Sequence, residues 1–188
     1  MDICEMKNQI RREYFAKRRA IQNDKRIAID QAICRALLEC EFFKSAEAIL
    51  FYAPKEPEVD ISPLFDYALS MNKRIAFPRC EKDNTLAFHY AEPNQLILGH
   101  FGILEPKETA PICRATDSSI CLVPALLFDS EGFRLGYGKG YYDRFLSDYH
   151  GKSIGIARND FILPKLPRDT FDLAVDILAS ETGVCILS

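Results

Sequence analysis

The sequence lacks the features that would assign it to the zinc-binding, disulfide-stabilised or membrane-spanning classes of protein. Its seven cysteines are an odd number without a CxxC pair, and its three histidines are scattered, so the spacing of a zinc site is missing. No apolar stretch approaches the roughly 18–20 residues that a membrane span requires, and the N-terminus has no apolar signal segment. These absences predict free, mostly buried thiols in a reducing compartment, and therefore a cytoplasmic protein that contacts no membrane.

The chain also lacks a strong excess of charge of either sign. Its 24 basic and 27 acidic side chains give a formal charge of −3, which does not favour a general polyanion-binding protein, and we expect no nucleic-acid partner. Repeats, low-complexity tracts and long linkers are absent as well. A chain of 188 residues with this composition predicts one domain over residues 1–188, and we expect a monomer.

Helical patterns alternate with short apolar runs along the chain. Helices are expected over residues 2–20, from a cap at Asn23 or Asp24 onward, from Ser62–Pro63 to about Met71, and over 141–149. Strands are expected at 48–53, 74–78, 86–91, 119–124 and 152–157, and residues 172–180 form a late strand or a turn. This alternation predicts an α/β protein with a largely parallel sheet.

The segment RLGYGKGYYDR (134–144) contains three glycines separated by single residues. Such a loop exposes successive backbone N–H groups that can bind a phosphate, and Arg134 and Lys139 add cationic donors. Asp143 supplies a carboxylate suited to Mg²⁺. The alternative is an ordinary turn between a strand and a helix. The expected position after an apolar strand, where ligands bind in parallel sheets, favours the phosphate-binding interpretation.

The expected N-terminal helix carries a basic flank. Lys7 and Arg11 share one helix face, and Arg18 lies one heptad further along on that side. This flank is either a solvated surface or a group of cations that reaches phosphates held by the glycine-rich loop.

Acidic residues follow or interrupt two of the apolar runs. Glu58 and Asp60 come after the strand expected at 48–53, where carboxylates could bind the amine and amide edge of a heterocycle. The alternative is a polar loop in which Asp60 caps the next helix. Asp176 lies in the apolar stretch FDLAVDILA, either as a strand-end residue bonded to backbone N–H groups or as a metal ligand opposite Asp143.

Together these segments resemble the 5-formyltetrahydrofolate cyclo-ligase family, also called 5,10-methenyltetrahydrofolate synthetases. The matching segments occur in order along nearly the whole chain: KNQIR (7–11), EVD (58–60), RIAFPR (74–79), FGILEP (101–106) and VPALLFDSEGFRLGYGKGYYDRFL (123–146). The resemblance implies a three-layer α/β/α sandwich with a mostly parallel sheet, similar to CoA transferases and sugar-phosphate isomerases.

The resemblance also implies a set of site residues. Those implied to bind ATP are Lys7, Arg11, Arg134, Leu135, Gly136, Tyr137, Gly138, Lys139, Gly140, Tyr141 and Tyr142, of which Arg134 and Lys139 act on the phosphate in catalysis. Those implied to bind the folate are Lys55, Tyr137, Tyr141 and either Glu58 or Asp60. The implied magnesium ligands are Asp143 and Asp176. Ile61 stands where the family usually has threonine, so the choice between Glu58 and Asp60 stays open.

The implied reaction is an ATP- and Mg²⁺-dependent conversion of 5-formyltetrahydrofolate to 5,10-methenyltetrahydrofolate. ATP phosphorylates the formyl oxygen, N10 attacks the activated carbon, and ADP and phosphate are released. Such phosphoryl transfer needs positioning and charge neutralisation more than a protein nucleophile. The alternatives are another enzyme on the same fold, for which Glu105 is a poor candidate nucleophile, or a nucleotide- or RNA-binding module that uses the basic helix.

Overall fold

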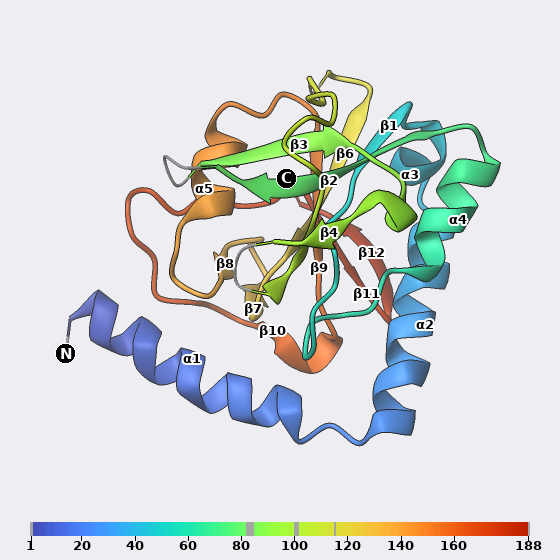
Figure 1. Cartoon of the computed structure of the whole chain (residues 1–188). Coiled ribbons are helices and arrows are strands. Elements are labelled where there is room, and N and C mark those ends of the chain that lie inside the picture. The colour runs from blue at the N-terminus through green and yellow to red at the C-terminus, as the bar shows by residue number, and fades with distance from the viewer. Residues whose placement is uncertain (1, 82–84, 100–101, 115, 188) are drawn as a thin grey trace.

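A mostly parallel sheet of seven strands forms the centre of the computed structural model, which describes residues 2–81, 85–99, 102–114 and 116–187 (Figure 1). The strand order is β12-β11-β9-β6-β1-β2-β3. The strands are β1 (Ala48–Leu50), β2 (Arg74–Cys80), β3 (Leu86–Tyr90), β6 (Ser119–Pro124), β9 (Lys152–Ile156), β11 (Ile177–Ser180) and β12 (Gly183–Ile186). The strands from β11 to β2 pair in parallel, and only the edge strands β3 and β12 are antiparallel. The predicted sheet is thereby confirmed.

Helices lie on both faces of this sheet (Figure 1). They are α1 (Ile3–Arg19), α2 (Asn23–Glu39), α3 (Glu41–Ser45), α4 (Pro63–Ser70) and α5 (Tyr141–Ser147), with short 3₁₀ turns at Pro93–Gln95 and Asn159–Phe161. Apolar residues of α2, α3 and α4 pack on one face, and those of α5 pack on the other. None of the described helices is long and apolar enough to cross a membrane.

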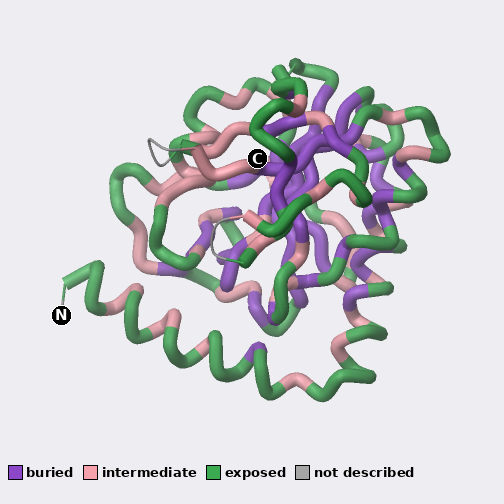
Figure 2. Tube along the Cα trace, viewed as in Figure 1, coloured by how far each residue is buried: buried purple, intermediate pink, exposed green. Residues whose placement is uncertain are grey.

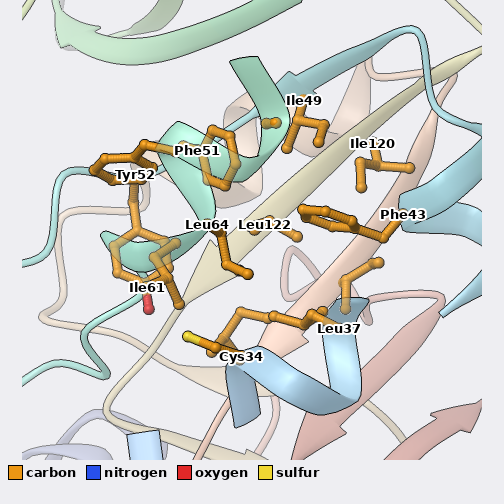
Figure 3. Packing of buried hydrophobic residues seen from close by; sticks show 14 of the residues in the cluster. Cys34, Leu37, Phe43, Ile49, Phe51, Tyr52, Ile61, Leu64, Ile120 and Leu122 are labelled. Atoms are coloured by element: carbon orange, nitrogen blue, oxygen red, sulfur yellow. The ribbon is translucent and has the colours of Figure 1, made fainter. Parts of the chain in front are cut away.

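The larger core lies between the sheet and helices α2, α3 and α4. Figure 3 shows Leu37 and Phe43 directed toward Ile120 and Leu122 of β6. Strands β1 and β6 are buried along almost their entire length, as expected for strands covered on both faces, and the tube in Figure 2 shows this buried centre. Burial of these side chains is the main favourable contribution to folding.

Two smaller sheets lie beside the main one. One has the order β10-β7-β8, with β7 at Leu127–Asp129, β8 at Arg134–Leu135 and β10 at Ile162–Leu163. The other pairs β4 (Ile97–Leu98) with β5 (Leu104–Glu105). The sequence-based prediction that the glycine-rich loop directly follows a main-sheet strand is wrong, because the β7–β8 hairpin intervenes. Two- and three-residue strands carry too little periodicity to be seen in the sequence.

Helix α1 packs against the three-stranded sheet rather than against the central one. Its apolar residues Ile10 and Tyr14 contact a cluster that includes Leu127, Leu135 and Phe161. Asp2 begins the helix with a capping box, since its side chain accepts a hydrogen bond from the Glu5 N–H and Glu5 accepts one from the Asp2 N–H. This packing places the basic flank of α1 beside the loop that follows β8.

Most expected elements agree with the structure, with differences at their ends. The predicted strand at 48–53 ends at Leu50, because the chain leaves the sheet there, and the predicted strand or turn at 172–180 is a strand only from Ile177. Helix α2 begins at Asn23, so Gln22 takes the cap position and the expected Asn23 or Asp24 cap is wrong by one or two residues. All seven cysteines are free and four are buried, as predicted.

A buried ion pair joins α2 to the end of β9. Arg158 donates from Nε to Asp30 Oδ1 (2.7 Å) and from Nη2 to Asp30 Oδ2 (2.9 Å). The same guanidinium donates to the carbonyls of Pro57 and Glu58, and the Asp60 N–H donates to Asp30. The pair therefore fixes the segment that follows β1.

We expect Asp30→Asn to lower the free energy of unfolding by about 3–5 kcal/mol, because it leaves Arg158 as an uncompensated buried charge. Urea unfolding followed by circular dichroism measures the change. Glu39→Gln, the same replacement at an exposed position of α2, is the matched control and should change stability by less than about 0.5 kcal/mol. Equal effects of the two variants would show that the pair does not stabilise the fold.

Candidate active site

A cavity of about 600 Å³ opens at the carboxyl ends of β1, β2 and β6. Tyr52 and Ala53 follow β1 on its wall, Cys80 ends β2, and Pro124 ends β6. The remaining walls come from α1, from residues 55–58, from Ile103 and Glu105, and from the glycine-rich loop. This is the edge at which parallel sheets bind ligands. The glycine-rich loop lines the cavity there, although it follows the β7–β8 hairpin rather than a strand of the main sheet. That a phosphate binds at this edge stays a prediction.

The cavity wall contains nearly all of the residues that the resemblance implies. They are Lys7, Arg11, Lys55, Glu58, every residue from Arg134 to Tyr142, and Asp143. Asp60 and Asp176 do not line it. Segments as distant in the sequence as α1 and the loop at 134–143 therefore meet at one site.

The glycine-rich loop requires glycine at two of its three glycine positions. Gly138 and Gly140 have φ angles of 91° and 66°, in the left-handed region that other residues rarely adopt. At Gly138 a Cβ atom would also lie 3.4 Å from Cζ of Arg11, so the backbone approaches α1 closely. Gly136 has no positive φ, and a Cβ atom there would meet none of the described atoms within 4 Å.

The cations of α1 are bonded to the loops around the cavity. Arg11 donates from Nε to the Gly136 carbonyl (2.9 Å), which ties the glycine-rich loop to the helix. Lys7 forms an ion pair with Asp172, and both side chains are largely buried. Arg11 thus reaches the glycine-rich loop and Lys7 reaches Asp172, so the solvated-surface interpretation is wrong for these two residues. That they reach phosphates held by the loop stays a prediction.

Arg134 and Asp143 form a largely buried ion pair at the base of the loop. Nη2 of Arg134 donates to Asp143 Oδ1 at 2.6 Å, and Nη1 donates to the Leu173 carbonyl. Burial lowers the pKa of Arg134, and the Asp143 carboxylate opposes this shift. Arg134 therefore remains a cation that orients Asp143 toward the cavity.

Of the two acidic candidates after β1, the structure brings Glu58 into the cavity. The Glu58 carboxylate accepts a hydrogen bond from the Lys55 N–H (2.9 Å). Burial raises its pKa, while that hydrogen bond and the positive charges of Arg18 and Lys55 lower it. Asp60 is exposed and accepts a bond from the Ser62 N–H, so it stabilises the turn before α4 without capping that helix by its side chain.

Asp176 lies just before β11, away from the cavity. Its Oδ2 accepts hydrogen bonds from the N–H and the hydroxyl of Ser153, and its Oδ1 accepts one from Lys152. Burial acts to raise the pKa of Asp176, but these three bonds outweigh it and the pKa is lowered. The structure thus does not place Asp176 opposite Asp143, and the strand-end interpretation describes its bonds.

Sequence reasoning missed several residues of the site. Two residues were not singled out. They are Asp172, which lines the cavity and pairs with Lys7, and Arg158, which donates to the backbone of residues 57–58. Their partners are distant in sequence, so no local pattern marks them. Two residues of the matching segment FGILEP (101–106), Ile103 and Glu105, also line the cavity, and the Glu105 side chain is almost fully buried. Phe101 of this segment lies outside the described residues.

The structure is a layered α/β fold with a cavity at the carboxyl ends of its parallel strands, lined by paired basic and acidic side chains. A family model described as the 5-formyltetrahydrofolate cyclo-ligase family matches residues 3–181. The chain therefore belongs to this family and is an enzyme of the ligase class that acts in folate metabolism.

Individual relatives agree with this assignment. A probable 5-formyltetrahydrofolate cyclo-ligase of Schizosaccharomyces pombe is 30% identical over 172 residues, which cover 81% of this chain and 84% of that protein. The 5-formyltetrahydrofolate cyclo-ligase of Mycolicibacterium smegmatis is 28% identical over 96% of this chain and 97% of its own length.

Solved structures share the fold. The 5,10-methenyltetrahydrofolate synthetase of Aquifex aeolicus superposes with a TM-score of 0.87 at 33% identity, covering 97% of this chain and 93% of that one. The synthetase of Mycoplasma pneumoniae superposes with a TM-score of 0.75 at 24% identity, covering 93% and 98% respectively.

We expect Asp176→Ala to lower the free energy of unfolding by about 1 kcal/mol at pH 7, because hydrogen bonds to Ser153 are lost while solvent screens the Lys152 pair. Since the folded pKa of Asp176 lies below the unfolded value of 3.8, its contribution is present above pH 3.8 and is lost as the pH falls through the folded pKa. Urea unfolding in metal-free buffer over this range measures the difference.

Asp148→Ala, which removes an exposed aspartate at the end of α5, is the control for Asp176→Ala. The hydrogen-bonding role would be contradicted if Asp176→Ala were as stable as the wild type in metal-free buffer and became less stable than the wild type only when Mg²⁺ was added to both proteins.

Proposed function

We propose that the protein catalyses the ATP- and Mg²⁺-dependent conversion of 5-formyltetrahydrofolate to 5,10-methenyltetrahydrofolate, with release of ADP and phosphate. The observation that carries the proposal is the meeting of the glycine-rich loop, the α1 cations and Glu58 in one cavity. Family membership and the activities for which the relatives are named support it. The exact substrates and the order of chemical steps are part of this proposal.

ATP is proposed to bind along α1 and the glycine-rich loop, over residues 134–142. Lys7 and Arg11 lie one helical turn apart on the same wall and face the loop, whose left-handed glycines direct its backbone toward α1. In this proposal the ATP phosphates take the place of the present partners of these cations. The partner of Lys7 is Asp172, and that of Arg11 is the Gly136 carbonyl. Lys139 and Arg134 supply positive charge near the phosphate that is transferred.

The donors at this end of the cavity fit a magnesium ion held partly by the nucleotide. Mg²⁺ is commonly bound through one or two carboxylates together with substrate phosphates, and Asp143 offers a carboxylate held in place by Arg134. When bound, Mg²⁺ neutralises charge on the phosphates. We propose Asp143 as its protein ligand and not Asp176, whose carboxylate is bonded to Ser153 and Lys152 outside the cavity.

The folate is proposed to bind beside residues 55–58. The Glu58 carboxylate can accept hydrogen bonds from the amine and amide edge of the pterin, and Lys55 lies at the neighbouring position on the wall. Tyr137 and Tyr141 connect this end to the nucleotide end, since both belong to the glycine-rich loop. Asp60 is not part of the proposed site.

The proposed chemistry needs no nucleophile from the protein. The formyl oxygen attacks the γ-phosphorus of ATP and ADP leaves, which gives an iminium phosphate. The N10 amine then attacks the activated carbon and gives up its proton to solvent, and loss of phosphate leaves the methenyl bridge. The protein holds the two substrates in line and stabilises the charge on the transferred group through Arg134 and Lys139.

Several further expectations stay predictions. They are the single domain, the monomeric state, the absence of a nucleic-acid partner, the likeness to CoA transferases and sugar-phosphate isomerases, and the cytoplasmic location. A relative in Arabidopsis thaliana is named as mitochondrial, so location differs among similar proteins. The rival interpretation as an RNA-binding module loses its main support, because Lys7 and Arg11 face the cavity.

We expect purified protein mixed with 5-formyltetrahydrofolate, ATP and Mg²⁺ to form the methenyl product, which absorbance of the methenyl chromophore detects. Omission of ATP, or addition of EDTA, should stop the reaction, because the phosphoryl group cannot then be transferred with its charge neutralised. Turnover that continues in EDTA would contradict the magnesium role, and no turnover under any condition would contradict the proposed reaction.

We expect Arg11→Ala to raise the KM for ATP by about 10- to 150-fold, because it removes a charge-assisted hydrogen bond worth roughly 1.5–3 kcal/mol. Steady-state kinetics at saturating folate measures the change. The KM for 5-formyltetrahydrofolate should change much less.

Arg12→Ala is the matched control for Arg11→Ala, since Arg12 is exposed and points about 100° away around the helix. Small, equal effects of the two substitutions on ATP would show that Arg11 does not contact the nucleotide.

A further inference from the structure

Glu105 is a buried acidic residue of the cavity wall that the proposed reaction does not use. It ends the short strand β5 and lines the cavity, and its side chain is only 3% exposed. Its Oε2 atom has no hydrogen-bond partner among the described residues. Because buried polar groups are normally hydrogen-bonded, and an unbonded one is costly, this arrangement is unfavourable for stability alone.

Arg79 supplies positive charge to Glu105 without donating a hydrogen bond to Oε2. Nη1 of Arg79 lies 3.9 Å from this oxygen, which is beyond hydrogen-bonding distance. The same Nη1 atom donates to the Pro106 carbonyl at 2.8 Å. The ion pair therefore offsets part of the cost of burying the carboxylate and leaves Oε2 without a donor.

Gly99 leaves the space in which the carboxylate lies. A Cβ atom on Gly99 would lie 2.5 Å from Cδ of Glu105, and the nearest atoms that it would meet all belong to this side chain. The backbone of Gly99 is not in the left-handed region, so its conformation does not itself require glycine. A larger residue at position 99 would therefore displace the Glu105 carboxylate.

Glu105 belongs to the end of the cavity at which the folate is proposed to bind. A Cβ atom on Gly102, just before β5, would lie 3.3 Å from Nζ of Lys55, so the Lys55 side chain reaches this hairpin. Lys55 and Ile103 line the cavity together with Glu105. Since Lys55 and Glu58 are proposed folate contacts, Glu105 lies beside the proposed folate subsite.

We propose that Glu105 is a specificity-determining residue that accepts a hydrogen bond from N8–H of the reduced pterin ring. This inference rests on the proposed function, in which Glu58 binds the amine and amide edge of that ring. N5 carries the formyl group, so N8 holds the ring N–H that Glu58 leaves unbonded. The substrate thereby supplies a donor to a carboxylate that is short of donors in the protein.

This contact selects reduced folates. In a fully oxidised folate such as folic acid, N8 is an aromatic nitrogen that has a lone pair and no hydrogen. Its lone pair would face the Glu105 carboxylate, so two acceptors would meet and neither would be bonded. A site that is built to hydrogen-bond a substrate N–H strongly rejects an analogue that lacks it.

The test compares the wild type with Glu105→Gln, Gly99→Ala and, as matched control, Glu108→Gln at an exposed position three residues further on. Calorimetry measures the Kd of each protein for 5-formyltetrahydrofolate, folic acid and ATP, and circular dichroism gives the Tm.

We expect Glu105→Gln to weaken binding of 5-formyltetrahydrofolate by at least about tenfold, or about 1.4 kcal/mol, because a neutral amide replaces a charge-assisted acceptor. Binding of folic acid should stay equal or become tighter, since the amide N–H can donate to N8. The preference for the reduced ligand therefore falls by at least about tenfold, and the Kd for ATP changes by less than about twofold.

The other variants separate a substrate contact from a structural role. Gly99→Ala keeps the carboxylate but displaces it, so it should also lower the preference for the reduced ligand, whereas Glu108→Gln should change no Kd. The Tm of Glu105→Gln should stay within about 3 °C of the wild-type value. An equal loss of both folates, unchanged affinity for both, normal ligand preference in Gly99→Ala, or an unfolded Glu105→Gln variant would each overturn the proposal.

Failure of the proposed function gives a different result. If the wild type binds 5-formyltetrahydrofolate but forms no methenyl product with ATP and Mg²⁺, the proposed reaction is wrong, and the ratio of the two folate affinities still decides the role of Glu105. If the wild type binds neither folate, the proposed folate site and the role of Glu105 are both wrong.

Discussion

The bidentate pair between Arg158 and Asp30 determines where the acidic wall of the cavity lies. It joins α2 to the end of β9, and its remaining donors and acceptors bond to residues 57, 58 and 60 of the segment after β1. A loop at the end of a buried strand has few other restraints on its direction. Both charged side chains are buried, so each hydrogen bond that they make helps to offset the cost of removing them from water. The position of Glu58 is thus set by two residues that never reach the cavity.

The charges at the proposed nucleotide end of the cavity are arranged as pairs rather than as isolated groups. Lys7 is bonded to Asp172, Arg134 to Asp143, and Arg11 to a loop carbonyl. Pairing allows several cations to stand close together without mutual repulsion in a partly buried wall. In the proposed binding mode an anionic substrate takes the place of these partners, so the cations are already oriented when it binds.

Long periodic segments were predictable from the sequence, whereas contacts between distant segments were not. The amphipathic pattern of α1 and the apolar runs of β6 and β9 gave elements with nearly correct ends, because local periodicity determines both. The glycine-rich loop was recognisable from its composition, and its resemblance to a family gave the positions around it. The pairs Lys7–Asp172 and Arg158–Asp30 span 165 and 128 residues, and no local pattern encodes such contacts. Glu58 lines the cavity whereas Asp60, two residues later, is exposed outside it, and this difference likewise follows from tertiary packing.

Helix α1 lines the cavity with Lys7, Arg11 and Phe15 at successive turns. At 1.5 Å per residue, Lys7 and Phe15 are about 12 Å apart along the helix axis. Lys7 and Arg11 belong to the proposed nucleotide subsite, and Phe15 packs edge to face on Tyr137, which is proposed to contact the folate as well. One helix therefore contributes to both proposed subsites. In the proposed site, a shift of this helix on filling one subsite would change the affinity of the other, and thermodynamic linkage would make the effect equal in both directions. The N-terminal helix would then couple the filling of the two proposed subsites.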